Sequence, residues 1–376
     1  MKIEKLKLPD SAIDFLKSQG YDKLYPPQAD CVKSGLLDGK SILVSAPTAS
    51  GKTLIAMLAM LSYLSKNKGK IIYLSPLRAL AAEKFTEFKK LEKISIGNKI
   101  KTSISTGDFE HIEKNLENSN VLILTNEKMD SIIRHGAEWI EDIGLVISDE
   151  VHLIGDESRG PTLEMILTHL KLLDTKPQIV GLSATITNSN EIADWLDCKL
   201  VKNDWRPVPL SEGVCDGGHV TMSDGKTFEV KPSLRGIPID LGVQSVQQGG
   251  QSLVFAETRV RSKSLATKAS DVVSQLLGKK ELAVLEKTSK QILAENEHTE
   301  IVKTLATLVR KGVAFHHAGL NQKCREIVEK EFRKGTIKLL SSTPTLAAGV
   351  NLPARRVVIS NINRYNAKVG ANRPIS

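Results

Sequence analysis

The segment at residues 46–53 (Ala-Pro-Thr-Ala-Ser-Gly-Lys-Thr) joins small residues to a lysine and a hydroxyl, between an apolar run and an apolar helical pattern. Small residues let backbone N–H groups turn inward around phosphate oxygens, and the helix N-terminus that follows adds partial positive charge. Lys52 would reach the β- and γ-phosphates of a nucleotide, and Thr53 would ligate magnesium. The other expected nucleotide contacts are Ala46, Thr48, Ala49, Ser50, Gly51 and Leu54. Ala46 replaces the usual first glycine, but the strand-loop-helix context favours a phosphate site over a chance turn.

Two carboxylates, Asp149 and Glu150, follow the apolar run at residues 145–147. Asp149 could hold magnesium directly or through water, and Glu150 could orient and deprotonate the attacking water. An isolated Asp-Glu pair is more often a solvated turn, but a buried strand and a phosphate loop in the same chain favour the catalytic interpretation. The other polar candidates are His152, Ser183 and Thr185. We expect the two hydroxyls to hydrogen-bond to the histidine or to the carboxylates.

The first half of the chain alternates short apolar runs with amphipathic segments, the pattern of a parallel sheet covered by helices. The apolar runs are residues 42–44, 71–74, 121–124, 145–147 and 179–182. Most of them lead directly into a polar cluster. Because ligands of doubly wound sheets bind at the carboxyl ends of the strands, we expect the phosphate loop and the carboxylates to lie at one sheet edge.

The alternation is interrupted at residues 203–214, where Pro207 and Pro209 favour an extended connection. Residues 218–231 then have the pattern of a hairpin with Asp224-Gly225 in its turn. Strand-like runs resume at residues 253–255, 313–315, 337–340 and 357–359, with helical stretches at 260–277 and 298–310. We expect two tandem, doubly wound α/β domains, at residues 1–205 and 206–376, with a cleft between them.

The composition is that of a folded globular protein, with 41% hydrophobic and 25% charged residues. Lys and Arg total 52 against 43 Asp and Glu, and this net charge of +9 suits a polyanionic partner or simply a basic surface. Four widely spaced cysteines without a CxxC pair predict neither a zinc cluster nor a disulfide framework. The N-terminus has no signal-sequence pattern, and no apolar run approaches the roughly 20 residues that span a bilayer. We expect a cytoplasmic protein without a membrane partner.

In this order, residues 46–53, residues 149–152 (Asp-Glu-Val-His) and residues 182–185 (Leu-Ser-Ala-Thr) resemble the superfamily-two helicases of the DExH type. Gln28, at the end of Leu-Tyr-Pro-Pro-Gln, resembles the adenine-reading residue of that family. Segments near residues 78, 106 and 125 resemble the elements that hold the backbone of a nucleic-acid strand. The strand contacts implied there are Arg78, Thr106, Gly107, Asp108, Thr125 and Lys128. Positions at strand ends suit phosphate and sugar contacts, which position a strand without reading its sequence.

The second half follows the order of the same family at residues 253–259, 314–320 and 342–353. The resemblance implies strand contacts by Thr258, Arg259, His317, Gly319, Thr343 and Thr345, and nucleotide contacts by Gly349 and Asn351. The pair His316-His317 has no second ligand pair at zinc spacing, so we expect a loop that contacts nucleic acid. The nearest family resemblance is to the archaeal Holliday-junction-migration helicases (Hjm), which are related to the helicase half of DNA polymerase theta. It rests on the motifs APTASGKT, PLRALA, DEVHLIGD, FHHAGL and TLAAGVNLPARRVVI.

This resemblance implies two RecA-like domains that use ATP and Mg²⁺ to move 3′ to 5′ along single-stranded or branched DNA, in replication-fork repair and recombination. The residues themselves do not set the polarity of movement. We expect the protein to be a monomer. A basic hairpin near residues 363–366, with Arg364, would wedge between duplex strands, and a solvated basic tail is the alternative.

The last motor motif of the family, Gln-x-x-Gly-Arg-x-Gly-Arg, does not occur in the sequence. Its arginines stabilise the transferring phosphoryl group and are typically worth ~10³ to 10⁵ in rate. We therefore interpret the sequence as the N-terminal portion of a longer helicase, able to bind nucleotide but with impaired turnover. Two alternatives stay open, an RNA helicase of the same superfamily and a nucleotide-switched module that binds nucleic acid without unwinding it.

Overall fold

The computed structural model describes residues 1–96, 98–107, 116–346, 352–361, 363–366 and 371–374. Internal contacts divide the chain into two compact units, Met1–Leu210 (unit 1) and Ser211–Ser376 (unit 2). The division falls in the segment between β9 (Lys199–Lys202) and β10 (Gly213–Asp216), which has neither helix nor strand. The boundary predicted after residue 205 lies in the same segment.

Unit 1 is built on a seven-stranded parallel sheet with the strand order β5-β6-β2-β7-β8-β1-β9. Its other strands are β1 (Ile42–Ser45), β2 (Lys70–Ser75), β5 (Thr102–Ser105), β6 (Val121–Thr125), β7 (Ile143–Ser148) and β8 (Gln178–Ser183). All five strands predicted from apolar runs are present. The edge strands β5 and β9 were not predicted, because polar residues interrupt their short apolar patterns.

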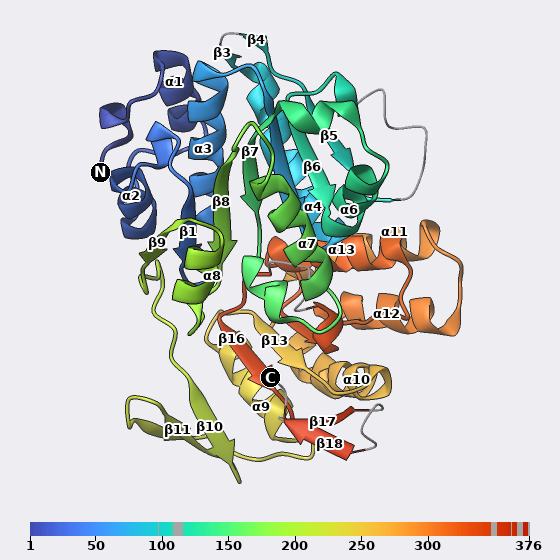
Figure 1. Cartoon of the computed structure of the whole chain (residues 1–376). Coiled ribbons are helices and arrows are strands. Elements are labelled where there is room, and N and C mark those ends of the chain that lie inside the picture. Colours follow the sequence, from blue (N-terminus) through green and yellow to red (C-terminus); the bar gives the residue numbers. More distant parts are fainter. Residues whose placement is uncertain (97, 108–115, 347–351, 362, 367–370, 375–376) are drawn as a thin grey trace. The chain divides into compact units, whose positions relative to one another are not determined.

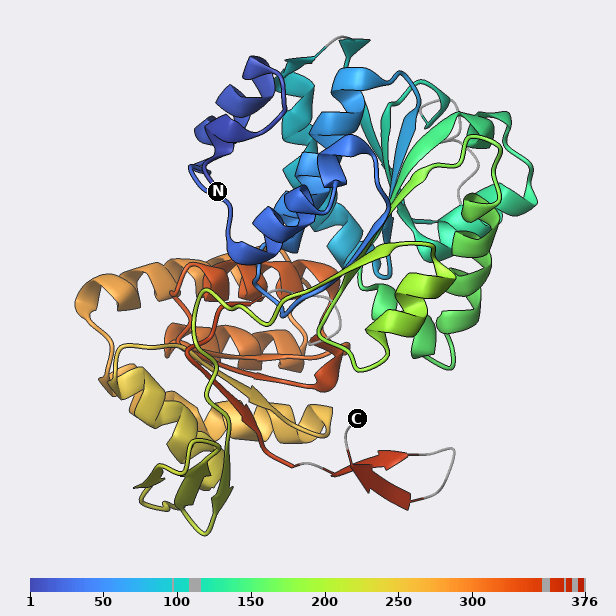
Figure 2. The same ribbon diagram turned by 60° about the vertical axis from the view of Figure 1, so that its left-hand side comes forward.

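Helices cover both faces of this sheet (Figure 1). Alternate residues of β2 point to opposite faces, so Ile71 and Tyr73 belong to one apolar core, and Ile72 and Leu74 to the other. The helices of the first core are α1 (Asp10–Ser18), α2 (Pro26–Lys33), α3 (Lys52–Lys66) and α4 (Arg78–Phe88). Those of the second core are α6 (Asn126–Arg134), α7 (Gly160–Lys171) and α8 (Ser189–Trp195). This arrangement confirms the predicted doubly wound α/β fold (Figure 2).

Shorter elements complete unit 1. The 3-10 turns are η1 (Ile3–Lys5), η2 (Leu36–Asp38), η3 (Lys89–Lys93), η5 (Glu138–Asp142) and η6 (Val151–Gly155). A two-stranded antiparallel ribbon pairs β3 (Ser95–Ile96) with β4 (Asn98–Lys99). Of these elements, only η6 directly follows the carboxylate pair at the end of β7.

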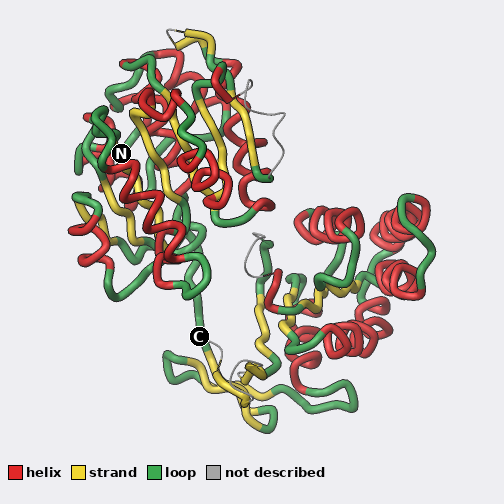
Figure 3. The backbone as a smooth tube through the Cα atoms, turned by 45° about the vertical axis from the view of Figure 1, so that its right-hand side comes forward, coloured by secondary structure: helices red, strands yellow, loops and turns green. Residues whose placement is uncertain are grey.

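Unit 2 contains a second parallel sheet, with four strands in the order β14-β15-β13-β16. Figure 3 shows helices, in red, beside the yellow strands of this unit. The strands are β13 (Ser252–Phe255), β14 (Val313–His316), β15 (Leu339–Ser342) and β16 (Arg356–Ile359). The helices are α9 (Ile237–Gln247), α10 (Arg259–Gln275), α11 (Lys279–Ala294), α12 (Glu300–Arg310) and α13 (Gln322–Arg333), followed by the 3-10 turn η7 (Pro344–Leu346). These elements share one apolar core. The predictions were incomplete here, because β15 begins two residues later than expected and the helices α9, α11 and α13 were not predicted.

Two antiparallel additions belong to unit 2. The predicted hairpin forms from β11 (His219–Met222) and β12 (Thr227–Glu229), and β10 adds a third strand. Arg356 places its guanidinium carbon 5.7 Å from the ring centroid of Phe228, which ties this sheet to β16. A second hairpin pairs β17 (Asn363–Asn366) with β18 (Ala371–Pro374), as predicted near residues 363–366. No helix in the described ranges is long and apolar enough to cross a membrane.

Candidate nucleotide and nucleic-acid sites

The phosphate loop connects β1 to α3, at the carboxyl edge of the unit 1 sheet. Gly51 has a φ of 86°, a backbone conformation that favours glycine, and a Cβ added there would displace the Gln28 side-chain amide. Thr48 and Ala49 are exposed at the tip of the loop, whereas Ala46, Ser50 and Leu54 are buried. The loop is therefore anchored at both ends and open at its tip.

The side chains of this loop fit a nucleotide phosphate group with a magnesium ion. Lys52 Nζ donates to the carbonyls of Ala46 at 2.9 Å and Pro47 at 3.3 Å, bonds that phosphate oxygens could replace. Ser50 Oγ is buried and has no hydrogen-bond partner among the described residues. The hydroxyl of Thr53 and the carboxylate of Asp149 are the oxygen ligands that Mg²⁺ prefers. These observations support an anion cradle at the N-terminus of α3.

Gln28 connects the N-terminal segment to the phosphate loop. Its Oε1 accepts from the backbone N–H of Tyr25 at 2.7 Å, and its Nε2 donates to the Gly51 carbonyl at 3.3 Å. The Tyr25 ring lies 4.6 Å from the Trp205 ring, between centroids. Sequence analysis missed Trp205, whose only signal is an aromatic residue in a proline-rich connection. The segment expected to recognise adenine is thus fixed to the loop expected to bind phosphates.

The two carboxylates lie directly after β7. The fully buried Tyr73 donates its hydroxyl to Asp149 Oδ2 at 2.6 Å, and Asp149 Oδ1 accepts from the backbone N–H of Glu150 at 3.0 Å. Burial, followed by the Asp149 charge, raises the pKa of Tyr73 well above its usual value, so the phenol stays a donor. Glu150 itself has a φ of 50°, which is unusual for a residue other than glycine. Sequence analysis missed Tyr73, which resembles an ordinary apolar strand residue.

Burial shifts the pKa values of the two charged groups expected to act on a nucleotide. Burial raises the pKa of Glu150, the neighbouring charge of Asp149 adds to this rise, and Lys52 opposes it. Burial lowers the pKa of Lys52, whereas the charges of Glu150 and Asp149 oppose that change. The charges of the two side chains therefore influence one another in a partly dehydrated site, where electrostatic interactions are stronger than in water.

His152 contacts the end of β8 in a different way from that predicted. Its Nδ1 lies 3.4 Å from the backbone N–H donor of Ala184 and 3.3 Å from Glu150 Oε2, and a neutral Nδ1 can serve only one of the two. Burial, and then Lys52, lowers the pKa of His152, which favours the neutral ring. Ser183 Oγ is buried without a hydrogen-bond partner among the described residues, and Thr185 is exposed. The contact comes from the backbone N–H of Ala184, the first residue after β8.

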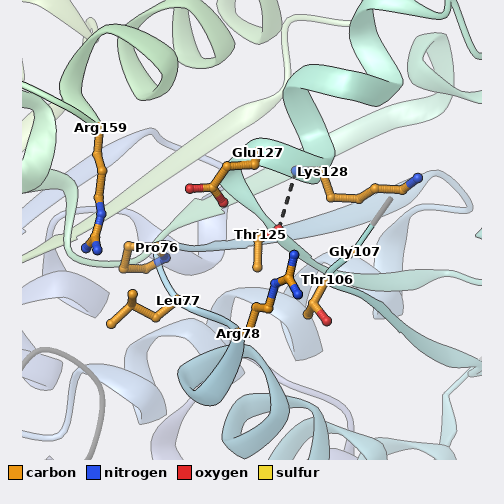
Figure 4. Close-up of a pocket in the computed structure, with 9 residues that line it drawn as sticks. All are labelled: Pro76, Leu77, Arg78, Thr106, Gly107, Thr125, Glu127, Lys128 and Arg159. Atoms are coloured by element: carbon orange, nitrogen blue, oxygen red, sulfur yellow. Dashed lines mark hydrogen bonds between the residues drawn. The ribbon is translucent and has the colours of Figure 1, made fainter. Parts of the chain in front are cut away.

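A pocket of about 330 Å³ lies at the same edge of the sheet, where β2, β5 and β6 end (Figure 4). Its lining residues are Pro76, Leu77, Arg78, Thr106, Gly107, Thr125, Glu127, Lys128 and Arg159. Five of the six predicted first-domain strand contacts thus line one pocket. The sixth, Asp108, lies outside the described residues. Thr125 also caps α6, because its Oγ1 accepts from the Lys128 backbone N–H at 3.3 Å.

Arg159 is a pocket residue that sequence analysis missed. It enters the pocket from the side opposite to Lys128 (Figure 4). The turn before α7 holds it, because Asp156 Oδ1 accepts from the backbone N–H groups of Ser158 and Arg159, each at 2.9 Å. The available sequence signal was a basic residue before Gly-Pro at a helix start, soon after the carboxylate pair. Together with Arg78, it gives the pocket two guanidinium groups, which suit phosphate oxygens.

In unit 2, four predicted strand contacts lie close together. Thr258 caps α10 by accepting from the Arg261 backbone N–H at 3.1 Å, and Arg259 is the exposed first residue of that helix. His317 Nδ1 accepts from the Gly319 backbone N–H at 3.1 Å. Burial lowers the pKa of His317, and the charge of the nearby Arg259 adds to this effect. A neutral imidazole beside an exposed arginine can accept hydrogen bonds as well as donate them.

Of the other predicted residues of unit 2, three lie in the described part of the chain and two lie outside it. The Thr343 backbone N–H donates to the His316 carbonyl at 3.2 Å, at the adjacent ends of β14 and β15. Thr345 lies within η7, and Arg364 lies opposite Arg373 in the β17–β18 pairing. Gly349 and Asn351 are outside the described residues. The structure therefore brings Thr343 to the same sheet edge as the His317 loop.

The comparisons with known proteins agree with this arrangement. Residues 25–192 match the family model of the DEAD/DEAH box helicases, and residues 271–368 match that of the helicase conserved C-terminal domain. The two matches lie in the two units that each contain a parallel sheet with helices. The chain therefore has the two RecA-like domains of a superfamily-two helicase.

Proteins similar to the chain include archaeal ATP-dependent DNA helicases named Hel308. The helicase of Methanocella arvoryzae is 43% identical over 372 residues, which are 99% of this chain and 50% of that protein. The helicase of Pyrococcus horikoshii is 43% identical over 366 residues, and that of Caldivirga maquilingensis is 42% identical over 382 residues, covering 49% and 48% of those proteins. The chain thus spans about half the length of the curated relatives it matches.

Proposed function

We propose that the chain is the motor of an ATP-dependent DNA helicase of the archaeal Hjm type, which moves 3′ to 5′ on single-stranded DNA during replication-fork repair and recombination. One observation carries the motor proposal: a phosphate loop, a carboxylate pair and a pocket with two arginines share one edge of the unit 1 sheet. Because these sites lie at the carboxyl ends of neighbouring parallel strands, a small structural change at one site can alter the other. The similarity to DNA helicases supports DNA as the partner.

Each residue of the nucleotide site has a proposed role. Lys52 binds the terminal phosphates, and Gln28 fixes the adenine segment against the loop. Thr53 and Asp149 would hold magnesium, which when bound neutralises phosphate charge. Glu150 accepts a proton from the water whose oxygen bonds to the γ-phosphorus as the bond to the β-phosphate oxygen breaks. His152 and the turn after Ser183 would respond to the state of that carboxylate.

The strand-binding roles rest on the two clusters of polar and basic residues. In unit 1, Arg78, Thr125 and Arg159 would contact phosphates and sugars, and in unit 2 the residues around His317 would do the same. Gly349 and Asn351 are proposed to face the nucleotide from unit 2. Closure of two such units around ATP would move the protein along a strand by alternating grips.

The Glu150→Gln variant tests the catalytic role. Replacing the carboxylate with an amide removes the proton acceptor and leaves the size of the side chain unchanged, so ATP hydrolysis should fall about 10²- to 10⁴-fold. Binding of a fluorescent ADP analogue with Mg²⁺ should stay within about 2-fold of the parent chain. Glu157→Gln, on the exposed turn, is the matched control and should change neither. Unchanged hydrolysis in Glu150→Gln would show that the chain does not use this carboxylate.

Turnover and nucleic-acid preference need separate measurements. Because the arginine motif is missing from the sequence, we propose that these 376 residues alone hydrolyse ATP slowly. Robust DNA-stimulated turnover by this chain would contradict that proposal. Competition between matched single strands of DNA and RNA distinguishes the DNA motor from an RNA helicase, since only RNA has a 2′-hydroxyl. Tighter binding of RNA would favour the RNA alternative.

A further inference from the structure

A buried lysine outside the predicted set contacts the proposed magnesium ligand Thr53. Lys84, on α4, donates from Nζ to Thr53 Oγ1 at 2.7 Å, and the residue is only 9% exposed. A lysine is rarely buried to this extent without specific partners, because removing its charge from water is costly. The hydrogen bond between Lys84 and Thr53 is therefore expected to have a role in the nucleotide site.

The carboxylates nearest to Lys84 on its own helix hold it only loosely. Glu87 lies 3.6 Å and Glu83 3.9 Å from Nζ, at the long end of the ion-pair range. The hydrogen bond to Thr53 Oγ1, at 2.7 Å, is shorter than either ion pair. The ammonium group thus lies closest to the proposed metal ligand, with both carboxylates of α4 within ion-pair distance.

We propose that the ammonium group of Lys84 competes with magnesium for Thr53. It donates to Thr53 Oγ1 while no metal is bound, and it moves away when the metal binds. This inference rests on the proposed function, because it takes Thr53 as a metal ligand. A hydroxyl oxygen that ligates Mg²⁺ at roughly 2.1 Å and also accepts from an ammonium would bring two positive charges together in a buried site. The ammonium group of Lys84 can move away from Thr53 because Glu83 and Glu87 are already within ion-pair distance and can pair with it.

The position of Lys84 also connects the metal site with the strand pocket. The helix that carries it begins at Arg78, which lines that pocket, and the strand before it carries Tyr73, which donates to Asp149. One continuous stretch, residues 73–84, therefore contacts both proposed metal ligands and lines the proposed strand site. A movement of the Lys84 side chain would therefore take place on α4, the helix that begins at Arg78.

The proposal is tested by measuring Mn²⁺ binding to the 376-residue chain by electron paramagnetic resonance, with and without ADP. Lys84→Met should bind Mn²⁺ at least about 5-fold more tightly than the parent chain, because the competing charge is gone. Lys84→Arg keeps the charge and should stay within about 2-fold of the parent. Lys89→Met, which removes an exposed lysine just after the same helix, is the control and should leave Mn²⁺ binding unchanged.

A second experiment does not require the Lys84 variants to fold. Glu87→Gln removes one of the groups to which Lys84 would turn, so Mn²⁺ should bind more weakly than to the parent chain. Unchanged or weaker Mn²⁺ binding in a folded Lys84→Met, or unchanged binding in Glu87→Gln, would overturn the proposal. If the parent chain bound neither Mn²⁺ nor a fluorescent ADP analogue with Mg²⁺, the proposed function itself would fail and this inference with it.

Discussion

At the scale of single residues, the candidate site depends on groups that are held in unusual states. Glu150 adopts a positive φ, and Asp149 is oriented by the buried hydroxyl of Tyr73. A residue other than glycine in the left-handed region costs of order 1 kcal/mol or more and persists only where its surroundings fix it. The site therefore resembles a preorganised catalytic centre more than a solvated turn, the alternative weighed for this carboxylate pair.

The lowered pKa of Lys52 predicts how nucleotide affinity depends on pH. Phosphates bind the protonated amine, so affinity should be complete below the pKa and fall as pH rises through it. Because burial lowers this pKa, the fall should begin at a lower pH than for an ordinary lysine. Binding of an ADP analogue without metal, measured from about pH 7 to about pH 10, should show this fall. The Lys52→Arg variant should not show this fall in affinity, because arginine stays protonated over the whole range. If the affinity of the variant still fell with pH, the titrating group would be another residue.

At the scale of elements, the turn between η6 and α7 connects the carboxylates to the strand pocket. A Cβ added at Gly160 would come within 2.1 Å of the Ile154 carbonyl oxygen, so the turn closes only with glycine. Asp156 fixes the same turn through backbone hydrogen bonds, and hydrogen bonds to Ser158 lower the pKa of its carboxyl. The backbone position of Arg159 is thus fixed by the packing and hydrogen bonds of this turn.

Gly160→Ala should destabilise unit 1. The added methyl group meets a backbone carbonyl that cannot move aside easily, and overpacking of this kind typically costs about 1–3 kcal/mol. Gly155→Ala, in the same turn, meets no atom within 4 Å and is the matched control. Urea unfolding of the two variants measures the difference. Equal stability of both would show that the turn can adjust around Gly160.

Arg159→Ala tests the pocket as a strand-binding site. Loss of one phosphate contact should weaken binding of a single-stranded DNA oligonucleotide and reduce the salt slope of log K by about 0.7. Arg78→Ala should behave similarly. The control is Arg134→Ala, which removes an exposed arginine at the end of α6 that pairs only with Asp130 among the described ion pairs. Fluorescence anisotropy at several salt concentrations gives both values. Unchanged slopes for both pocket variants would exclude this pocket from strand binding.

At the scale of the whole molecule, each unit has apolar cores of its own, and no apolar cluster among the described residues includes members from both units. The extended segment after β9 connects the two units. A core of its own is what each of two independently folded domains requires.

The motor proposal predicts closure when both ligands are present. Donor and acceptor dyes at Lys68→Cys in unit 1 and Lys279→Cys in unit 2, both exposed positions, would report it by fluorescence energy transfer. The two partly exposed native cysteines, Cys198 and Cys215, are replaced by serine. Transfer efficiency should change when a non-hydrolysable ATP analogue and single-stranded DNA are added together. A signal that responds to neither ligand would contradict nucleotide-driven closure.

The sequence by itself determined the features that depend on local pattern. The phosphate loop, the carboxylate pair and the strands that present them are recognisable because a buried parallel strand must be a short apolar run followed by the residues of its carboxyl end. The same logic placed Arg78, Thr106 and Thr125 at strand ends, and the structure brings these residues into one pocket.

Only the tertiary structure decided the contacts between residues distant in the sequence. Tyr73 lies 76 positions from Asp149, and Lys84 lies 31 positions from Thr53, so no local spacing indicates either hydrogen bond. Arg159 likewise reaches a pocket built from the ends of other strands. These polar side chains follow no helix or strand period, because their partners are chosen by which chain segments the sheet brings side by side.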